Sequence, residues 1–167
     1  AIVDISDPAN PTTTGNWDPN NTDIIAAPTN IVVSGKYAYV TGGSSSNLSI
    51  IDISNQAAPT TTGQIGGLAI PTSIDIAGNY AYVNEQDDNA VTVIDISSST
   101  NPVKIGEWSP NDTNILWAPS RSDIQGGHLY MLGQVSDNML ILDLPSLITP
   151  TAEIGNLLAN DIESDYV

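Results

Sequence analysis

The chain of 167 residues is 40% hydrophobic and has no cysteine, which fits one folded domain and excludes disulfides, thiolate metal sites and cysteine nucleophiles. Its 19 acidic residues against 3 basic ones give a net charge of −16, and this field would repel a polyphosphate, so we expect no nucleic-acid partner. The sequence has no run of about 18 apolar residues, so we expect no membrane span in this chain.

Runs rich in Ile, Val, Thr and Tyr alternate with Gly, Pro, Asn and Asp, which predicts short strands joined by turns and no helix. In chain order, the predicted strands are 1–6 and 11–17; 29–34, 36–41, 47–54 and 59–65; 72–77, 79–84, 89–97 and 102–108; 120–125, 127–133, 138–144 and 150–155; and a last extended segment, 160–167. Four strands in a unit of roughly 40 to 50 residues is typical of a β-propeller blade.

A phrase with a central Asp marks this repeat. It reads Ile-Val-Asp-Ile-Ser around Asp4 and returns around Asp52, Asp95 and, less closely, Asp143, at spacings of 48, 43 and 48 residues. A buried carboxylate is costly without partners. We therefore expect these four residues to lie inside apolar strands and to accept hydrogen bonds from a turn, as part of the scaffold in every repeat.

The expected fold is thus an all-β propeller of four-stranded antiparallel blades, forming a single domain over residues 1–167. Complete blades are expected at 28–65, 71–108 and 119–155. We expect about four blades in all, with one blade split between the N-terminal and C-terminal ends.

The two ends of the sequence each predict half of this split blade. Residues 1–17 supply a third and a fourth strand, and residues 160–167 supply a first strand or the first two. The halves can meet within one chain and close a ring, or meet between chains and build a filament with Ile2, Val3 and Ile5 as the assembly edge. They can also pack on further blades, because the sequence begins inside a repeat and we expect it to be a piece of a longer product.

Two recurring motifs resemble the LVIVD repeat family. One is Asp-Ile-Ser followed by Pro seven residues after the Asp, as in Asp52 and Pro59; the other opens a Tyr-rich strand, as in 34–40 and 78–83. The resemblance covers nearly the whole chain. It implies a propeller fold and an extracellular or cell-surface location, as in bacterial and archaeal secreted or surface proteins, and it carries over no catalytic residue.

Loops rich in Asp and Asn are expected to share one face of the propeller. The loops after Trp17 and Trp108 are equivalent and lie 91 residues apart. Carboxylate and amide oxygens suit Ca²⁺, although Asp and Asn are also good turn formers and the spacing matches no EF-hand. The candidate ligand or calcium residues are Asp18, Asn20, Asp23, Asp87, Asp88, Asn111, Asp112 and Trp117, with calcium itself assigned to Asp18, Asp23 and Asp112. No other cofactor is predicted.

The role of the tryptophans beside these loops has two interpretations. Trp17 and Trp108 are expected to fill the joints between blades, and the alternative is that they form platforms for sugar rings. Trp117 is the better ligand candidate because nothing in the repeat requires it.

Three Asn-x-Ser/Thr sequons are candidate glycosylation sites. They begin at Asn20, Asn47 and Asn111, and glycans on them would fit loops of a secreted glycoprotein. An Asn-rich and Thr-rich chain also contains such sequons by chance.

The sequence contains no motif that indicates a particular catalysed reaction. His128 is the only histidine, so a Ser-His-Asp triad has one possible base, and no Gly-x-Ser-x-Gly elbow accompanies it. Acidic loops offer carboxylate pairs for glycoside hydrolysis, but their spacing selects none. We therefore predict that the chain is not an enzyme and assign no catalytic residue.

The sequence favours a non-catalytic extracellular or cell-surface module for structural assembly, adhesion or protein interaction. Its expected partners are itself, as a homo-oligomer or a filament with shared blades, or other surface proteins and glycans. The alternative is a propeller that binds carbohydrate or another small ligand on the loop face, with hydrolysis less favoured.

Overall fold

The computed structural model describes residues 1–17, 24–111, 115–144 and 159–160. Every regular element within these ranges is a strand, and the strands form four antiparallel sheets. The described residues contain no helix, and therefore none that could cross a membrane. The all-β prediction is confirmed.

Three sheets have four strands each and follow the chain as simple meanders. The first blade consists of β3 (Pro28–Ser34), β4 (Tyr37–Gly42), β5 (Asn47–Asp52) and β6 (Thr60–Gly66). The second consists of β7 (Pro71–Ala77), β8 (Tyr80–Glu85), β9 (Ala90–Asp95) and β10 (Val103–Trp108). The third consists of β11 (Pro119–Gln125), β12 (His128–Gly133), β13 (Asn138–Asp143) and β14 (Ala159–Asn160). The fourth sheet is a hairpin of β1 (Ile2–Asp4) and β2 (Thr12–Gly15).

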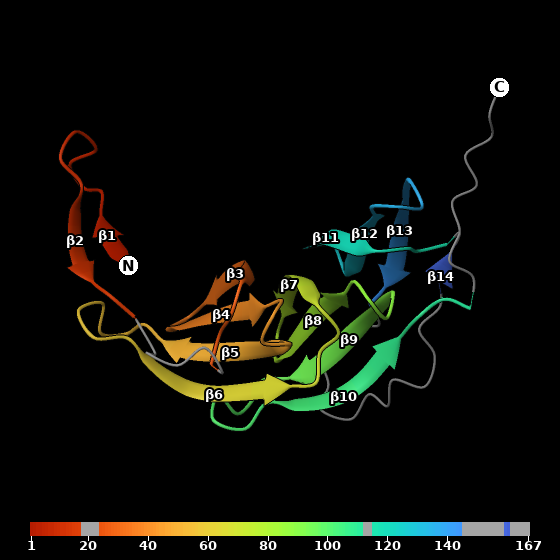
Figure 1. Cartoon of the computed structure of the whole chain (residues 1–167), viewed down its shortest axis with the longest axis horizontal. Helices are drawn as coiled ribbons and strands as arrows, with labels where there is room; N and C mark the ends of the chain where they lie inside the picture. The colour runs from red at the N-terminus through yellow and green to blue at the C-terminus, as the bar shows by residue number, and fades with distance from the viewer. Residues whose placement is uncertain (18–23, 112–114, 145–158, 161–167) are drawn as a thin grey trace.

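The blades are arranged radially, as in a propeller. Figure 1 shows them along an open arc, with the β1–β2 hairpin at one end and the third blade at the other. The first strands β3, β7 and β11 lie next to one another. Hydroxyl groups join them: Thr29 Oγ1 donates to the Pro71 carbonyl at 2.6 Å, and Thr72 Oγ1 donates to the Pro119 carbonyl at 2.7 Å.

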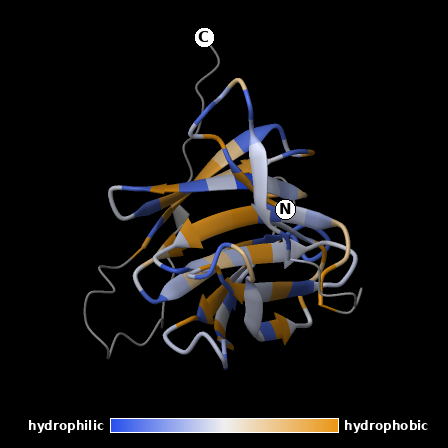
Figure 2. Cartoon of the chain, turned by 90° about the vertical axis from the view of Figure 1, so that its left-hand side faces the viewer, coloured by the Kyte–Doolittle hydropathy of each residue, from blue (hydrophilic) through white to orange (hydrophobic). Residues whose placement is uncertain are grey.

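Side chains on the middle strands alternate between two neighbouring blades, because successive residues of a strand point to opposite faces. The face toward the following blade, which we call the forward face, carries a Tyr and two aliphatic residues. These are Tyr39, Leu48 and Ile50 in the first blade and Tyr82, Val91 and Val93 in the second. Figure 2 shows the hydrophobic segments mostly within the strands.

The opposite side, which we call the rear face, packs against the forward face of the preceding blade. Its residues are Ala81, Val83 and Ile94 in the second blade and Leu129, Met131 and Leu142 in the third. Forward and rear faces together form the two main buried clusters. The core therefore lies between blades rather than within any one of them.

The hairpin occupies the place of the third and fourth strands of a preceding blade, as the sequence predicts. Ile2 lines a cavity of about 260 Å³ against the rear face of the first blade, which includes Val40 and Ile51. Trp17 packs on the same cluster, and its indole N–H donates to Thr61 Oγ1 at 3.2 Å. The cavity lies beside the hairpin, where the first two strands of a complete blade would pack.

The end of the third blade differs from the prediction. The strand that pairs with β13 is β14, in which Asn160 pairs with Ile141, so Asn160 belongs to the third blade and does not open a half-blade. The free edge of a strand offers backbone groups only, and the side-chain pattern does not fix which residues pair with it. The expected fourth strand at 150–155 and most of the C-terminal half-blade, 161–167, lie outside the described residues.

The repeated Asp residues have the predicted partners but not the predicted burial. Asp4, Asp52 and Asp95 each accept the backbone N–H of the Ser two residues later, at 2.8 to 2.9 Å. They are exposed or half-buried because each is the last residue of its strand and caps the following turn. Asp143 instead pairs with His128, at 2.9 Å. These carboxylates therefore belong to the scaffold without being buried.

Candidate functional site

Trp117 is the most prominent residue of the loop face. Its backbone is held on both sides, since its N–H donates to Ser136 Oγ at 3.2 Å and its carbonyl accepts from the Val135 N–H at 3.3 Å. Its side chain is 48% exposed. The residue thus combines an exposed aromatic side chain with a fixed backbone, and its role as a ligand residue stays a prediction.

The other two tryptophans fill joints. Trp17 lies between the hairpin and the first blade, and Trp108 packs on the cluster between the second and third blades. Both are half-buried. The preferred prediction for these two residues, structural rather than ligand-binding, agrees with these positions.

The calcium candidates do not gather into a site where the structure describes them. Asp87 and Asp88 lie exposed in the loop between β8 and β9, and Asn111 is exposed after β10. Among the described residues, no three Asp, Glu, His or Cys side chains come close enough together to hold a metal ion. Four of the ligand candidates, Asp18, Asn20, Asp23 and Asp112, lie outside the described residues.

Asn47 is not suited to carry a glycan in this fold. Its side chain is 1% exposed, and its amide donates to the Ile24 carbonyl at 2.8 Å. A glycan on that nitrogen would have to displace the atoms that bury it. Asn111 is exposed, and Asn20 lies outside the described residues.

Asn47 is buried because it belongs to a group of polar side chains that bond to the loop before the first strand of its blade. We call such a group a polar cap. In the first blade Ser45 Oγ accepts the Ala26 N–H at 2.9 Å beside Asn47, and in the third blade Ser136 does the same for Trp117. Asn138 donates to the Ile115 carbonyl at 2.6 Å, as Asn47 does to Ile24.

The second blade builds its cap from different residues. Glu85, which is fully buried, accepts the Ala69 N–H through Oε2 at 2.7 Å. Ala90 stands where the other blades have Asn, and Asp88 stands where they have Ser. Sequence reasoning missed Glu85. The signal was that the other two blades have glycine at the equivalent positions, 42 and 133, so a glutamate there departs from the repeat. The other oxygen of Glu85, Oε1, and Thr92 Oγ1 are buried and have no hydrogen-bond partner among the described residues.

His128 has no free nitrogen for proton transfer. Its Nε2 lies 2.9 Å from Asp143 Oδ1, and its Nδ1 lies 3.0 Å from the Gly126 carbonyl. Both partners are oxygen acceptors, so the ring is held on two sides by the turn and the strand end. This geometry favours the predicted role of a packed strand residue.

The first strands meet through a polar network near the axis. Ser122 donates through Oγ to Asp75, and its backbone N–H donates to Ser73 Oγ at 3.2 Å. Asn30 extends the network, donating to Ser73 Oγ at 3.3 Å. Burial raises the pKa of Asp75 above its usual range. Every polar side chain named here joins one blade to its neighbour.

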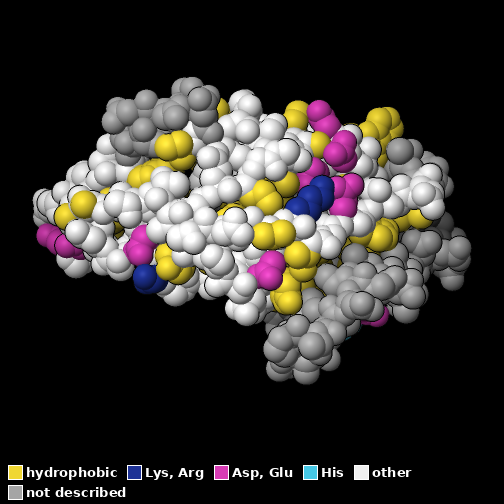
Figure 3. Space-filling model, turned by 90° about the horizontal axis from the view of Figure 1, so that it is seen from below, with side chains coloured by type: hydrophobic (Ala, Val, Ile, Leu, Met, Phe, Trp, Pro, Cys, Tyr) yellow, Lys and Arg dark blue, Asp and Glu magenta, His cyan; other side chains and the backbone are white. Residues whose placement is uncertain are grey.

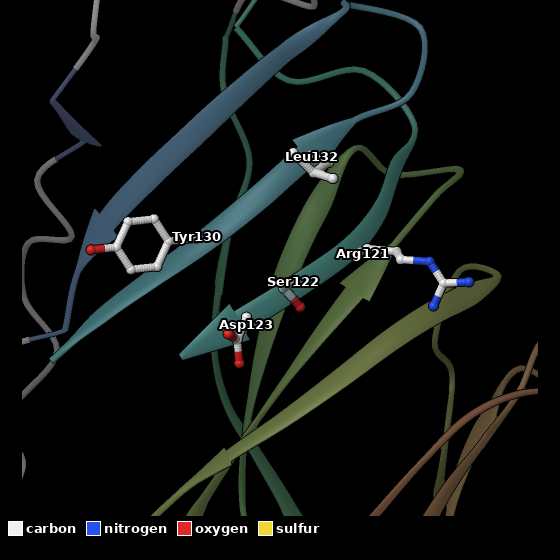
Figure 4. Close-up of a pocket in the computed structure, with 5 residues that line it drawn as sticks. All are labelled: Arg121, Ser122, Asp123, Tyr130 and Leu132. Atoms are coloured by element: carbon white, nitrogen blue, oxygen red, sulfur yellow. The ribbon is translucent and has the colours of Figure 1, made fainter. Parts of the chain in front are cut away.

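A pocket of about 290 Å³ lies on the forward face of the third blade. It is lined by Arg121, Ser122, Asp123, Tyr130 and Leu132. Figure 4 shows Arg121 and Tyr130 pointing in different directions, from β11 and β12. The charged and aromatic groups therefore do not converge on one point, as they would in a preformed site for a small ligand.

Two apolar faces at opposite ends of the arc are open to solvent. The first is the rear face of the hairpin, where Val3 is 46% and Ile5 is 69% exposed; we call it the hairpin face. The second is the forward face of the third blade, which we call the blade-three face. It comprises Tyr130, Leu132, Met139 and Ile141, with Leu132 and Met139 about half exposed.

Figure 3 views the molecule from the side of the outermost strands, where hydrophobic side chains lie in several groups between areas of backbone and other side chains and beside acidic and basic ones. We take the two end faces as the candidate functional surfaces for assembly, because equivalent residues elsewhere in the repeat pack against a neighbouring blade.

Comparison with known families gives one match. The model of the LVIVD repeat matches residues 1–19, 28–65 and 71–109, which contain the hairpin and the first two blades. No curated protein matches the chain.

Other proteins of solved structure share the fold. Three of them are a functionally unknown protein from Desulfotomaculum acetoxidans (TM-score 0.64, 16% identity), hydrazine synthase from Kuenenia stuttgartiensis (0.59, 22%) and a protein from Bacteroides uniformis provisionally called a 6-phosphogluconolactonase (0.63, 17%). The similar regions cover 80%, 71% and 90% of this chain, but 41%, 33% and 45% of those proteins. The chain thus spans less than half of each, and identities this low show the fold alone.

Proposed function

Since the chain belongs to the LVIVD repeat family, we propose that it is a non-catalytic extracellular or cell-surface propeller module for structural assembly, adhesion or protein interaction. The observation that carries the proposal is the pair of open apolar faces at the two ends of the arc. A blade buries its faces only against its neighbours, so an open array exposes apolar surface at each end. Contiguous exposed apolar surface on a soluble protein is typical of an interaction site.

The hydrophobic residues of these faces occupy positions that are buried elsewhere in the repeat. Met139 is equivalent to Leu48 and Val91, which are at most 1% exposed, and Val3 is equivalent to Ile94, which is fully buried. The repeat thus uses these positions for packing against another sheet. This supports a role in which other protein surface covers them.

The acidic surface and the resemblance support the location. A net charge of −16 makes copies of the protein repel one another and opposes non-specific association. The family resemblance implies a secreted or surface setting. Proteins with these repeats would present stacked blades to neighbouring proteins or glycans.

The chemistry of the described residues supports a non-catalytic role. The only histidine has both ring nitrogens engaged, and the buried carboxylate Glu85 accepts a backbone N–H. Asp75 bonds to Ser122 across a blade joint. Each of these polar groups serves packing between elements.

The test is a set of charged substitutions on the hairpin face. We expect the Val3→Lys/Ile5→Lys variant to lose self-association or partner binding, measured by light scattering on a sizing column. The matched control is Val103→Lys/Ile105→Lys on β10, where both residues are about as exposed as Val3. Unchanged particle mass in the Val3→Lys/Ile5→Lys variant would contradict the proposal, as would an equal loss in both variants.

A second candidate function rests on Trp117 alone. An exposed aromatic face on a fixed backbone could stack on a sugar ring, so the loop face is also a candidate site for carbohydrate or another small ligand. A glycan array would test it: binding lost in Trp117→Ala but kept in Val135→Ala, which changes an equally exposed neighbour, would support a sugar platform. Binding that both variants keep would reject Trp117 as that platform.

A further inference from the structure

The blade-three face is the third copy of an interface that the structure already forms twice. Tyr130 pairs with Ile141 across β12 and β13, as Tyr39 pairs with Ile50 and Tyr82 pairs with Val93. These two earlier Tyr–aliphatic pairs are buried against the following blade. The third pair has the same chemistry and register, and no described blade follows it.

The hydrogen bonds between first strands also stop at the third blade. Thr29 and Thr72 each donate to a Pro carbonyl on the first strand of the following blade. Ser120 is their equivalent in the third blade, and its hydroxyl donates to the Leu132 carbonyl in its own blade, at 3.5 Å. Among the described residues, the hydroxyl therefore has no counterpart of the bond between blades.

The hairpin face is the complementary half of that interface. Val3 is equivalent to Ile94 and Leu142, and Ile5 is equivalent to Ile96, all rear-face residues that pack on a forward face. Leu48 and Ile94 share one buried cluster, and Val91 and Leu142 share the next. By this repeat, Met139 and Val3 belong to the two halves of one such cluster.

We propose that the blade-three face binds the hairpin face of a second copy of the chain, with Met139 of one copy against Val3 of the next. The inference rests on the proposed function and names its partner. The occupant is a second copy because the two faces continue one established interface, and Figure 1 places them at opposite ends of the arc within a single chain. The contact joins two different surfaces, so it is heterologous and repeats head to tail.

The hairpin supplies only the third and fourth strands of the partner blade. In the two observed joints the second strand of a blade contacts the first strand of the next, so the hairpin covers the outer part of the blade-three face, to which β13 contributes, rather than β12. The pocket beside Arg121 and Asp123 would stay open toward the axis. The contact is therefore smaller than a complete joint between blades. We expect a reversible association that grows with protein concentration.

Cross-linking between two single-cysteine variants tests the pairing, since the chain has no cysteine of its own. Val3→Cys protein is mixed with a mass-tagged Met139→Cys protein and treated with a short bismaleimide. Both positions are exposed, so the variants should fold, which circular dichroism would check. We expect the mixed dimer to form at least about tenfold faster than with a Val103→Cys partner, because docking raises the local thiol concentration from micromolar toward millimolar.

Three outcomes would overturn the inference. The first is an equal rate with the Val103→Cys control. The second is a Val3→Cys/Met139→Cys double variant that cross-links into a closed monomer, which would mean that the chain's own hairpin reaches the blade-three face. The third is a wild-type protein that forms oligomers by light scattering without this cross-link; in that case the proposed assembly function stands and only the pairing is wrong. A wild-type protein that binds neither itself nor another protein would reject the proposed function as well.

Discussion

Gly63 lies directly against the backbone of Ser99: a Cβ atom added to Gly63 would lie 2.2 Å from the Ser99 carbonyl oxygen. Gly15 has the same relationship to Gln56, at 1.8 Å. The fourth strand of one sheet thus approaches the loop between the third and fourth strands of the next so closely that no side chain fits. The glycine that recurs eleven residues after the repeated Asp is therefore a contact between blades.

We predict that Gly63→Ala destabilises the protein, since a methyl group there must displace backbone. Overpacking of this kind costs about 1–3 kcal/mol of unfolding free energy. Gly66→Ala on the same strand is the matched control: the nearest atom to its added Cβ is the Ser46 carbonyl oxygen at 4.0 Å, so the change should be neutral or slightly stabilising. Urea unfolding of both variants would measure the difference, and equal stabilities would contradict the close contact.

The polar cap of the second blade predicts that two further substitutions can compensate for the loss of Glu85. Glu85→Gly should cost about 1–3 kcal/mol, because the Ala69 N–H loses its acceptor in a buried loop. Adding Asp88→Ser and Ala90→Asn recreates the cap of the first and third blades and should recover much of that loss. A triple variant no more stable than Glu85→Gly alone, in thermal unfolding, would show that the caps are not interchangeable.

Asp52 predicts a loss of stability in acid. Hydrogen bonds from Ser54 and the ion pair with Lys36 lower the pKa of Asp52 to about 2. The folded pKa lies below the unfolded value of about 3.9, so this contribution is fully present above about pH 4 and is lost as the pH falls toward 2. The melting temperature of Asp52→Asn should therefore fall less than that of the wild type over this range. Parallel curves would contradict the assignment, and Lys36→Met should remove only the ion-pair part.

Ionic strength should promote the head-to-tail contact. Copies with a net charge of −16 repel one another, and salt near 1 M shortens the screening length to about 3 Å while leaving apolar burial intact. We expect the weight-average mass from light scattering to rise between low and high salt. A mass that falls with salt would mean that ion pairs, rather than Met139 and Val3, hold the copies together.

The repeat made most of the fold predictable. The equivalent Asp, Pro and Gly positions fix where strands begin and turn, because a turn between two strands needs the positive φ that Gly35 and Gly78 adopt at 58°. The alternation of side chains fixed which face of each strand is buried. The predicted blade limits of the first two blades agree with the observed strands for this reason.

Features that depend on contacts between distant residues could not be predicted. The burial of Asn47 arises from the Ile24 carbonyl, which lies 23 residues away along the chain. Ile70 adopts a φ of 51° before Pro71, close to the values of Ala27 and Ala118 before Pro28 and Pro119, and branched residues rarely take this conformation. The side-chain pattern of the sequence does not fix which residues pair with the edge of β13, where Asn160 pairs with Ile141, so Asn160 was placed one blade too late.

Light scattering on a sizing column, over a series of concentrations and with negative-stain images of the same sample, tests the central claim most directly. The measurement uses the unmodified 167-residue chain, first with calcium and then with chelator. The account predicts a mass that grows with concentration beyond the 17.5 kDa of one chain, with short linear particles in the images, in both conditions. A compact 17.5 kDa particle at every concentration would contradict assembly through the two end faces.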